Sequence, residues 1–199
     1  MNYNFVDIGT SDFQTSVEKL FDFPDAVILL VEPLKFYLDN LPTSENIIKA
    51  NLAVSDKNGL ADIFFLSEKD IDHYNFIQCV RGCNKIGIPH VSIEYELFRR
   101  GLPKSLIKQE SIQTVTFQEL CYRYNIESID YLKVDTEGHE EFIIPGVLSQ
   151  IKSGLLIKEI QFENQEYLGN KKLLDSLALE FVELGYTLTY KDADVVLTR

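Results

Sequence analysis

The sequence predicts an α/β fold with a mostly parallel sheet. Short apolar segments alternate with helical patterns along most of its 199 residues, as in folds built from strand–helix–strand units. The segment "DAVILLVEP" (25–33) is a continuous apolar run that ends in an acid, which is typical of a strand buried on both faces. The final segment "YTLTYKDADVVLTR" predicts a hairpin that adds an antiparallel strand at one side of the sheet.

The elements of the first part are expected in the following order. Strands are predicted at 3–9 and 25–33, and helices at 15–23, where Val17, Leu20 and Phe21 share one face, and at 34–41. The segments 46–56 and 59–67 flank "DKNG", whose Asn58-Gly59 is a strong turn signal. We therefore expect these two segments to pair as a hairpin.

The pattern fades from about Ile71 to Glu110, and we expect an irregular insertion at about 70–110 with a binding function. Tyr74, His90 and Tyr95 are its candidate pocket residues. The less favoured alternative is a zinc site made by His73, Cys79, Cys83 and His90. The basic residues Arg99, Arg100, Lys104 and Lys108 are expected to form a solvated face. The whole chain, 1–199, is expected to be a single domain.

Regular patterns return in the second part. "SIQTV" (111–115) predicts a strand, and Thr116 with Glu119 has the spacing of a capping box that begins a helix. The segments 128–135 and 155–164 predict strands. The segments 138–154, with Pro145 as a candidate kink, and 170–185 predict helices.

Composition excludes several classes of protein. The formal net charge is −12, which argues against binding nucleic acid or anionic lipid. No apolar run reaches the ~18 residues of a membrane span, and the N-terminus does not resemble a signal peptide. The three cysteines favour reduced thiols and a cytoplasmic location. Because the chain starts directly on a strand, we expect it to be a domain of a longer protein.

Acidic residues follow three of the predicted strands. Asp7 and Gly9 end the first strand, Glu32 ends the second, and "KVDTEGHEEF" (133–142) follows the fourth. Alone, each has an ordinary explanation as a helix cap, a turn or a solvated strand end. Together they lie at the edge where parallel sheets bind ligands, and an acid after the second strand can accept hydrogen bonds from a ribose diol.

With these motifs the sequence resembles the FkbM family of S-adenosylmethionine-dependent methyltransferases. The resemblance runs through "FVDIG", "VEP", "NLAVSDKNG", "IDYLKVDTEGHEEFIIPG" and "QFE", and leaves about 70–110 unplaced. It implies a class I methyltransferase (Rossmann-like) fold, with a seven-stranded sheet, a C-terminal antiparallel hairpin and helices on both faces. It also implies O-methyl transfer to a hydroxyl of a small molecule or glycan, most readily a sugar.

The resemblance assigns roles by position. The candidate cofactor-binding residues are Asp7, Gly9, Thr10, Ser11, Glu32, Pro33, Ala53, Val54 and Asp135, with Ser55 or Asp56 as polar partners near the adenine. The first loop departs from the family pattern, because Ser11 and Phe13 stand where Asn and Gly are usual. This departure bears on where the methionine part of the cofactor sits.

A hydroxyl needs a base or a metal ion to become a good nucleophile. Asp135, His139 and Glu137 are the candidate catalytic residues, and only His139 has a reference pKa near neutrality. If a metal is used, Asp135 and Glu137 offer oxygen ligands that suit Mg²⁺ or Mn²⁺. Glu140 and Glu141 are expected to face solvent.

Two other functions stay open. A catalytically inactive binding module could keep this fold with a changed first loop. A nicotinamide-dependent oxidoreductase also places an acid on a ribose, but it needs a second phosphate-binding glycine that "GTSDF" lacks.

Overall fold

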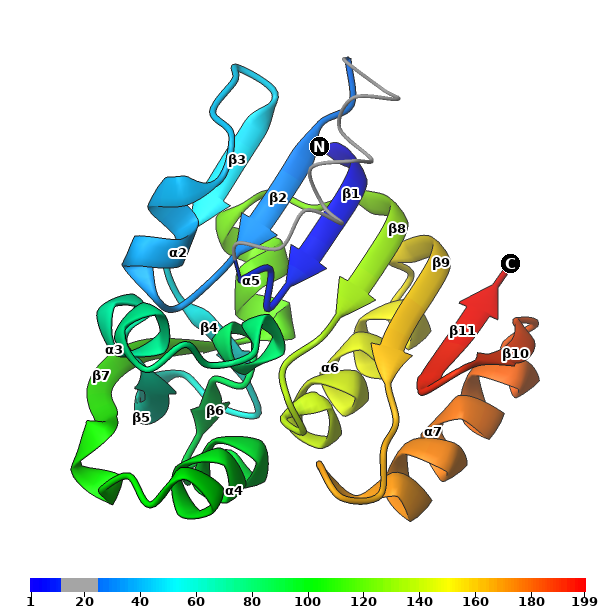
Figure 1. The fold of residues 1–199 in the computed structure, drawn as a ribbon. Coiled ribbons are helices and arrows are strands. Elements are labelled where there is room, and N and C mark those ends of the chain that lie inside the picture. Colours follow the sequence, from blue (N-terminus) through cyan, green and yellow to red (C-terminus); the bar gives the residue numbers. More distant parts are fainter. Residues whose placement is uncertain (12–24) are drawn as a thin grey trace. The chain divides into compact units, whose positions relative to one another are not determined.

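The structure is a computed structural model that describes residues 1–11 and 25–199. The predicted helix at 15–23 and Phe13 of the first loop lie outside the described residues. The chain divides into two compact units, one formed by Met1–Gly59 with Gln113–Arg199 and the other by Leu60–Ile112. Figure 1 shows the elements along the chain.

The first unit contains a seven-stranded sheet with the order β10-β11-β9-β8-β1-β2-β3. Four adjacent pairs are parallel, from β3 across to β9, and the two pairs made by β11 are antiparallel. The strands are β1 (Asn2–Ile8), β2 (Ile28–Val31), β3 (Ile47–Ala50), β8 (Ser128–Val134), β9 (Leu156–Glu163), β10 (Thr187–Lys191) and β11 (Asp194–Thr198). The mostly parallel sheet and its C-terminal hairpin are therefore confirmed.

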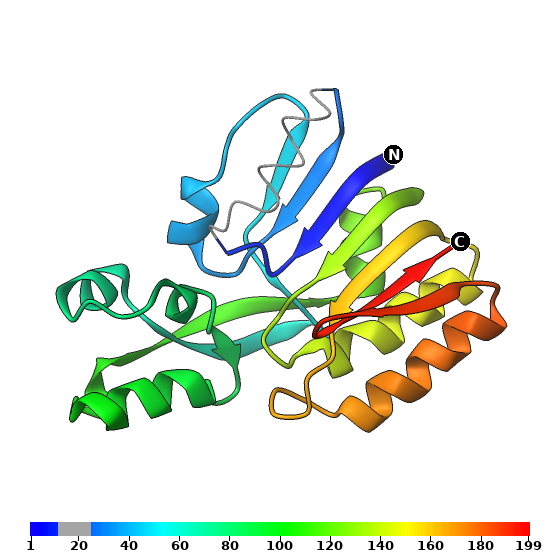
Figure 2. The same cartoon turned by 45° about the vertical axis from the view of Figure 1, so that its right-hand side comes forward.

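Helices cover both faces of this sheet. The helices are α2 (Lys35–Asn40), α5 (Phe117–Arg123), α6 (Glu140–Lys152) and α7 (Lys171–Glu183). Figure 2 shows α6 and α7 along one face, where the large core gathers side chains such as Val134, Ile144 and Phe181. On the other face, Leu38 of α2 packs in a smaller cluster with Phe5 and other strand residues.

The alternation of side chains along the strands explains how charged residues can lie within this sheet without entering the large core. Successive residues of a strand point to opposite faces. In β8, Leu132 and Val134 are buried in the large core, whereas Lys133 is only partly buried. The face opposite the large core therefore carries polar side chains near the ends of the strands.

The predicted hairpin at 46–67 is wrong. The first segment splits into β3 and β4 (Ala53–Ser55), which lie in different sheets. The second sheet has the order β4-β7-β5-β6, so β4 pairs in parallel with β7 (Ile107–Thr116) and does not neighbour β5 (Gly59–Leu66). Asn58 instead accepts a hydrogen bond at Oδ1 from the Thr116 backbone N–H at 2.8 Å, which fixes the turn by a contact distant in sequence.

The second unit is more regular than the predicted insertion. Besides parts of β5 and β7 it contains α3 (Glu68–His73), the 3₁₀ helices η1 (Gln78–Arg81) and η2 (Lys104–Leu106), β6 (Lys85–Ile86) and α4 (Val91–Arg100). It has its own apolar cluster, which includes Leu66, Ile71, Phe76, Ile93 and Leu97. Short elements with few periodic positions hid this core from the sequence pattern.

The basic group of the second unit is paired with acids and aromatic rings. Arg99 and Arg100 both donate to Glu96, at 2.8 and 3.0 Å, and Arg100 also lies over the ring of Phe76. Lys104 pairs with Glu94 at 2.6 Å. Arg99, Lys104 and Lys108 keep about half or more of their side chains exposed, as expected of a solvated face, whereas Arg100 is partly buried.

No helix in the described parts of the chain combines the length and the apolar character needed to cross a membrane.

Candidate active site

Glu32 follows β2 and is held by backbone groups on both sides. Its Oε2 accepts from the Ser11 N–H at 2.9 Å, and its Oε1 accepts from the Leu34 N–H at 2.8 Å. The residue is only 4% exposed. Each carboxylate oxygen can accept a second hydrogen bond, so the group is oriented before any ligand arrives.

The loop after β1 approaches the end of β8 closely at Gly9. Gly9 has φ +85°, and a Cβ built there would lie 1.9 Å from the carbonyl oxygen of Asp135. Thr10 and Ser11 follow as buried polar residues, and Ser11 has φ +48°. Only glycine fits at the contact, because any side chain would overlap the backbone of the next strand.

Lys133 places a cation between the acids of β1 and β8. Its Nζ lies 2.9 Å from Asp135 Oδ2 and 3.9 Å from Asp7 Oδ1. Burial by itself would lower the pKa of the Lys133 ammonium, but the carboxylates of Asp7 and Asp135 outweigh burial and raise it. Lys133 was not among the predicted site residues, although its spacing of two residues from Asp135 predicts that both side chains lie on one face.

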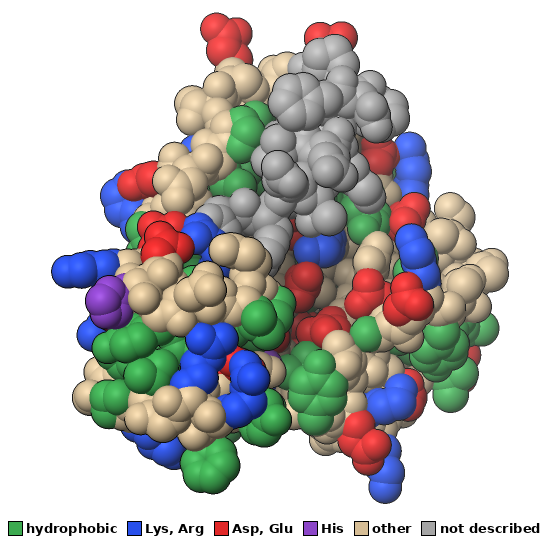
Figure 3. Space-filling view, in the orientation of Figure 1, with side chains coloured by type: hydrophobic (Ala, Val, Ile, Leu, Met, Phe, Trp, Pro, Cys, Tyr) green, Lys and Arg blue, Asp and Glu red, His purple; other side chains and the backbone are tan. Residues whose placement is uncertain are grey.

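Two further acids, Glu163 and Asp194, follow Asp135 across the ends of the neighbouring strands. Val134 of β8 pairs with Phe162 of β9, so the next residues, Asp135 and Glu163, lie side by side. On the other side of β9, Glu163 pairs with Asp194 of β11. Figure 3 shows acidic side chains gathered over this part of the sheet. Glu163 belongs to the quoted "QFE" segment, but only strand register reveals that it lies next to Asp135.

His139 directly precedes α6, and its side chain contacts Ser55 at the end of β4. Its Nε2 is 3.0 Å from the hydroxyl of Ser55, and that hydroxyl donates to Asp56 Oδ1 at 3.1 Å. Because the Ser55 proton is used on Asp56, Nε2 must be the donor toward Ser55. The imidazole also contacts the ring of Phe142, with 4.7 Å between ring centroids. The structure thus joins His139 to the segment predicted to lie near the adenine.

Glu140 does not face solvent, in contrast to the prediction. It is 1% exposed, and its Oε1 accepts from the backbone N–H and the hydroxyl of Thr136, at 2.6 and 2.8 Å. Burial raises the pKa of Glu140 to about 7. The Glu140 side chain therefore turns back to the loop before α6, where Thr136 supplies both of its hydrogen-bond donors.

The remaining predicted site residues are Pro33, Ala53 and Val54, which were assigned to the cofactor, and the catalytic candidate Glu137. Pro33 follows Glu32, and its carbonyl accepts from Asn51 Nδ2 at 2.8 Å. Ala53 and Val54 are buried in β4, and Val54 belongs to the large core. Glu137 lies in the loop before α6 with φ +56°.

The residues of the first unit do not fit a Mg²⁺ or Mn²⁺ site at Asp135 and Glu137. The Asp135 oxygen Oδ2 is already bonded to the Lys133 ammonium at 2.9 Å, and a second cation there would be repelled. Within the described part of the first unit, no three potential ligand side chains converge. Metal activation is therefore not part of the mechanism proposed below.

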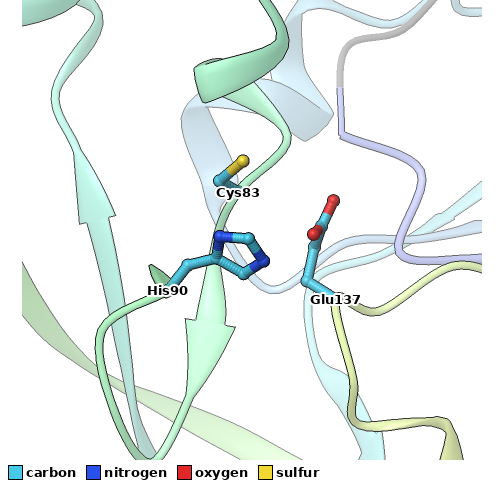
Figure 4. Close-up of side chains that lie close together, drawn as sticks. All are labelled: Cys83, His90 and Glu137. Atoms are coloured by element: carbon cyan, nitrogen blue, oxygen red, sulfur yellow. The ribbon is translucent and has the colours of Figure 1, made fainter. Parts of the chain in front are cut away.

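The four-ligand zinc alternative does not form in the second unit. Figure 4 shows the imidazole of His90 beside the thiol of Cys83, with a ligand atom of each within 4.8 Å of the other. His73 and Cys79 are exposed, and no other ligand of the second unit joins the pair. His90 Nδ1 accepts from the Ser92 N–H at 3.1 Å and caps α4, so His90 has a structural role.

A comparison with protein-family models decides the family. The model described as "Methyltransferase FkbM domain" matches residues 6–188. The chain belongs to the FkbM methyltransferase family. No curated protein and no solved structure matches it in the parallel comparisons. The FkbM match covers both units in sequence and includes every residue assigned above to the edge of the first sheet except Asp194.

Membership of the FkbM family implies use of S-adenosylmethionine, and the residues present fit that cofactor. The Glu32 carboxylate is oriented by two backbone N–H groups, as a group that accepts hydrogen bonds from a ribose diol would be. The Ser11 hydroxyl is buried with no hydrogen-bond partner among the described residues. Gly9 allows the loop after β1 to approach the backbone of Asp135, because a Cβ there would lie 1.9 Å from the Asp135 carbonyl oxygen. These three features lie together at the ends of β1 and β2, where this FkbM domain would hold a nucleoside.

Proposed function

We propose that this FkbM domain is a class I, S-adenosylmethionine-dependent O-methyltransferase that acts on a hydroxyl of a small molecule or glycan, with a sugar as the favoured acceptor. The observation that carries the proposal is the Glu32 carboxylate, oriented by two backbone N–H groups at the end of β2, within a chain matched to a methyltransferase family. The strand order, with an antiparallel strand inserted beside β9, also supports the class I assignment.

The cofactor would be held by the first unit. Glu32 would accept hydrogen bonds from the two ribose hydroxyls, and Gly9, Thr10 and Ser11 would line the methionine side. Ala53 and Val54, with Ser55 held by His139, would border the adenine. Asp7 lies beneath this loop at the end of β1 and is balanced by Lys133.

S-adenosylmethionine, when bound, supplies an electrophilic methyl group on a sulfonium. The chain must then align an acceptor oxygen and take its proton. Asp135, with 41% of its side chain exposed, would position the hydroxyl. Glu137 and His139 remain catalytic candidates, although His139 Nε2 is engaged by Ser55.

The acceptor itself would be selected by the second unit. It carries exposed aromatic side chains, Tyr95 and Phe98, on α4, and aromatic faces commonly bind sugar rings. A glycan acceptor would also suit a domain within a larger glycan-modifying protein.

Calorimetry tests the cofactor assignment. The wild-type protein should bind S-adenosylmethionine and S-adenosylhomocysteine but not NAD. Glu32→Ala should lose at least tenfold in affinity for both, since unpaired ribose hydroxyls cost about 1–3 kcal/mol. The matched control is Asp39→Ala, which removes a carboxylate paired with Lys35 on the surface of α2 and should bind normally.

Two outcomes would replace the proposal. Binding of NAD in preference to both adenosyl ligands would favour the oxidoreductase. Cofactor binding without S-adenosylhomocysteine formation over a broad panel of sugar acceptors would favour the inactive binding module. Circular dichroism of Glu32→Ala must match that of the wild-type protein, because the same carboxylate also holds Ser11 and Leu34.

A further inference from the structure

Glu163 occupies a position that neither the sequence motifs nor the proposed cofactor contacts explain. It ends β9 between Asp135 on one side, by strand register, and Asp194 on the other. Its Oε1 accepts from Gln165 Nε2. Its Oε2 is buried and has no hydrogen-bond partner among the described residues. One carboxyl oxygen is thus anchored, and the other is left for a proton or a ligand.

The groups around Glu163 are mostly acids. Asp135 belongs to the end of β8, Glu137 to the following loop, Glu140 to α6 and Asp194 to β11. Lys133 is the nearest cation that the contacts identify, and its ammonium is bonded to Asp135. Glu163 therefore has no ion-pair partner of its own among the described residues.

This environment disfavours a carboxylate at Glu163. Burial, followed by the charges of Asp135 and Glu137, raises the pKa of Glu163 to about 8, although the hydrogen bond from Gln165 acts in the opposite direction. Near neutral pH most molecules then carry a proton on Glu163. Because Oε1 accepts from Gln165, the proton lies on Oε2.

We propose that Glu163 holds a proton in the cofactor-free protein, releases it when the cationic cofactor binds beside Asp135, and then accepts the proton of the acceptor hydroxyl. This inference rests on the proposed function and names its proton acceptor. A positive charge that enters a cluster of acids stabilises the ionised form of each of them. Entry of the sulfonium thus creates the base only when the methyl donor is present.

The proton and electron balance closes around Glu163. Its Oε2 takes the proton as the acceptor O–H bond breaks and the oxygen forms its bond to the methyl carbon. The methyl–sulfur bond breaks with its electron pair on sulfur, which leaves a neutral thioether. With the positive charge gone, Glu163 stays protonated, as in the cofactor-free protein.

His139 is less suited to this step in the present arrangement. Its Nε2 donates toward Ser55, whereas Glu163 Oε2 is uncommitted among the described residues. The two candidates can be distinguished by which variant, Glu163→Gln or His139→Gln, loses the release of a proton on cofactor binding.

Calorimetry in buffers of different ionisation enthalpy measures the protons released on binding and needs no acceptor. At pH 7.5, S-adenosylmethionine should release about 0.8 proton more than neutral S-adenosylhomocysteine, as expected for a group of pKa about 8 that becomes ionised. Glu163→Gln should abolish that difference. Glu159→Gln, four residues earlier in the same strand, should preserve it.

The wild-type protein provides a second measurement without any variant. Between pH 6 and 8 the affinity for S-adenosylmethionine should rise by up to tenfold per pH unit relative to S-adenosylhomocysteine. This comparison also covers the case in which Glu163→Gln does not fold.

The outcomes distinguish this inference from the proposed function. If neither adenosyl ligand binds, the proposed function fails, and the inference with it. If both bind with equal proton release, or with a pH-independent ratio of affinities, only the inference fails. Release that persists in Glu163→Gln, or disappears in His139→Gln instead, would assign the proton to another group.

Discussion

Glu140 shows how a single carboxyl group can be buried at a helix start without a cation. Its Oε1 is satisfied by two donors of Thr136, which a protonated carboxyl retains. Asp7 and Asp135 instead lie near a cation, with the Lys133 ammonium 3.9 Å from Asp7 Oδ1 and 2.9 Å from Asp135 Oδ2. Carboxyl groups at this end of the sheet are therefore accommodated in two ways, beside an ammonium or beside uncharged hydrogen-bond donors.

Glu140→Gln should change the pH dependence of stability. The pKa is raised from 4.5 to about 7 in the folded protein, so the stabilisation is complete below the unfolded pKa and is lost as pH rises through the folded pKa. Glutamine stays neutral and keeps the acceptor oxygen. Urea unfolding from pH 4.5 to 8 should therefore favour the variant progressively, by up to roughly 3 kcal/mol.

Glu141→Gln is the matched control for this series, since it removes a less buried carboxylate one residue along the same helix. It should keep the wild-type pH dependence. A difference in the free energy of unfolding between wild type and Glu140→Gln that does not change with pH would contradict the assignment. Glu163, whose pKa is also raised, contributes in the same direction and remains present in both proteins.

At the scale of elements, the loop after β1 is determined by what it touches. The Gly9 N–H donates to the Val31 carbonyl at 2.9 Å, and the Asp135 N–H donates to the Ile8 carbonyl at 2.9 Å. The ends of three adjacent strands are therefore tied together by backbone hydrogen bonds. A side chain at Gly9 would separate β1 from β8 where the proposed cofactor site is formed.

Gly9→Ala should be far more destabilising than Gly185→Ala. Both glycines have similar positive φ values, +85° and +92°, but only Gly9 has a backbone atom within 2 Å of the added Cβ, and Gly185 has nothing within 4 Å. The conformational cost of about 1–2 kcal/mol should be common to both. Urea unfolding should show several kcal/mol of additional loss for Gly9→Ala, with loss of S-adenosylhomocysteine binding.

Equal stabilities for the two glycine variants would mean that the loop relaxes away from Asp135 at little cost. In that case Gly9 would matter only for its backbone conformation.

At the scale of the whole molecule, the chain forms two compact units, and we propose that they have different functions. All the proposed cofactor residues lie in the first unit, and Leu60–Ile112 forms the second around its own apolar cluster. We expect the second unit to select the acceptor, since none of the residues proposed to hold the cofactor belongs to it.

Leu97→Ala tests this division. Leu97 is 1% exposed in the cluster of the second unit, so truncation should cost about 2–5 kcal/mol. The affinity for S-adenosylhomocysteine should stay within twofold of wild type under conditions where the protein is folded. Leu132→Ala, equally buried but in β8 of the first unit, is the control that should weaken binding; loss of binding in a folded Leu97→Ala protein would contradict the division.

The sequence by itself predicted most of the described elements of the first unit, the mostly parallel sheet and the family. Apolar runs that end in acids identify parallel strands because their side chains are buried on both faces. Capping residues such as Thr116 identify helix starts, and its side chain does accept from the Glu119 N–H at 3.1 Å. These signals are local, so they can be interpreted without knowing which strands are neighbours.

Only the tertiary structure decided which side chains meet. The pairing of β4 with β7 replaced the expected hairpin because strand partners are chosen by packing over long sequence distances, which a turn signal at Asn58-Gly59 does not encode. The same holds for Glu163, which is 28 residues from Asp135 in sequence but stands beside it because β8 and β9 pair in parallel with Val134 opposite Phe162. Protonation follows from such neighbours and from burial, and both exist only once the sheet is assembled.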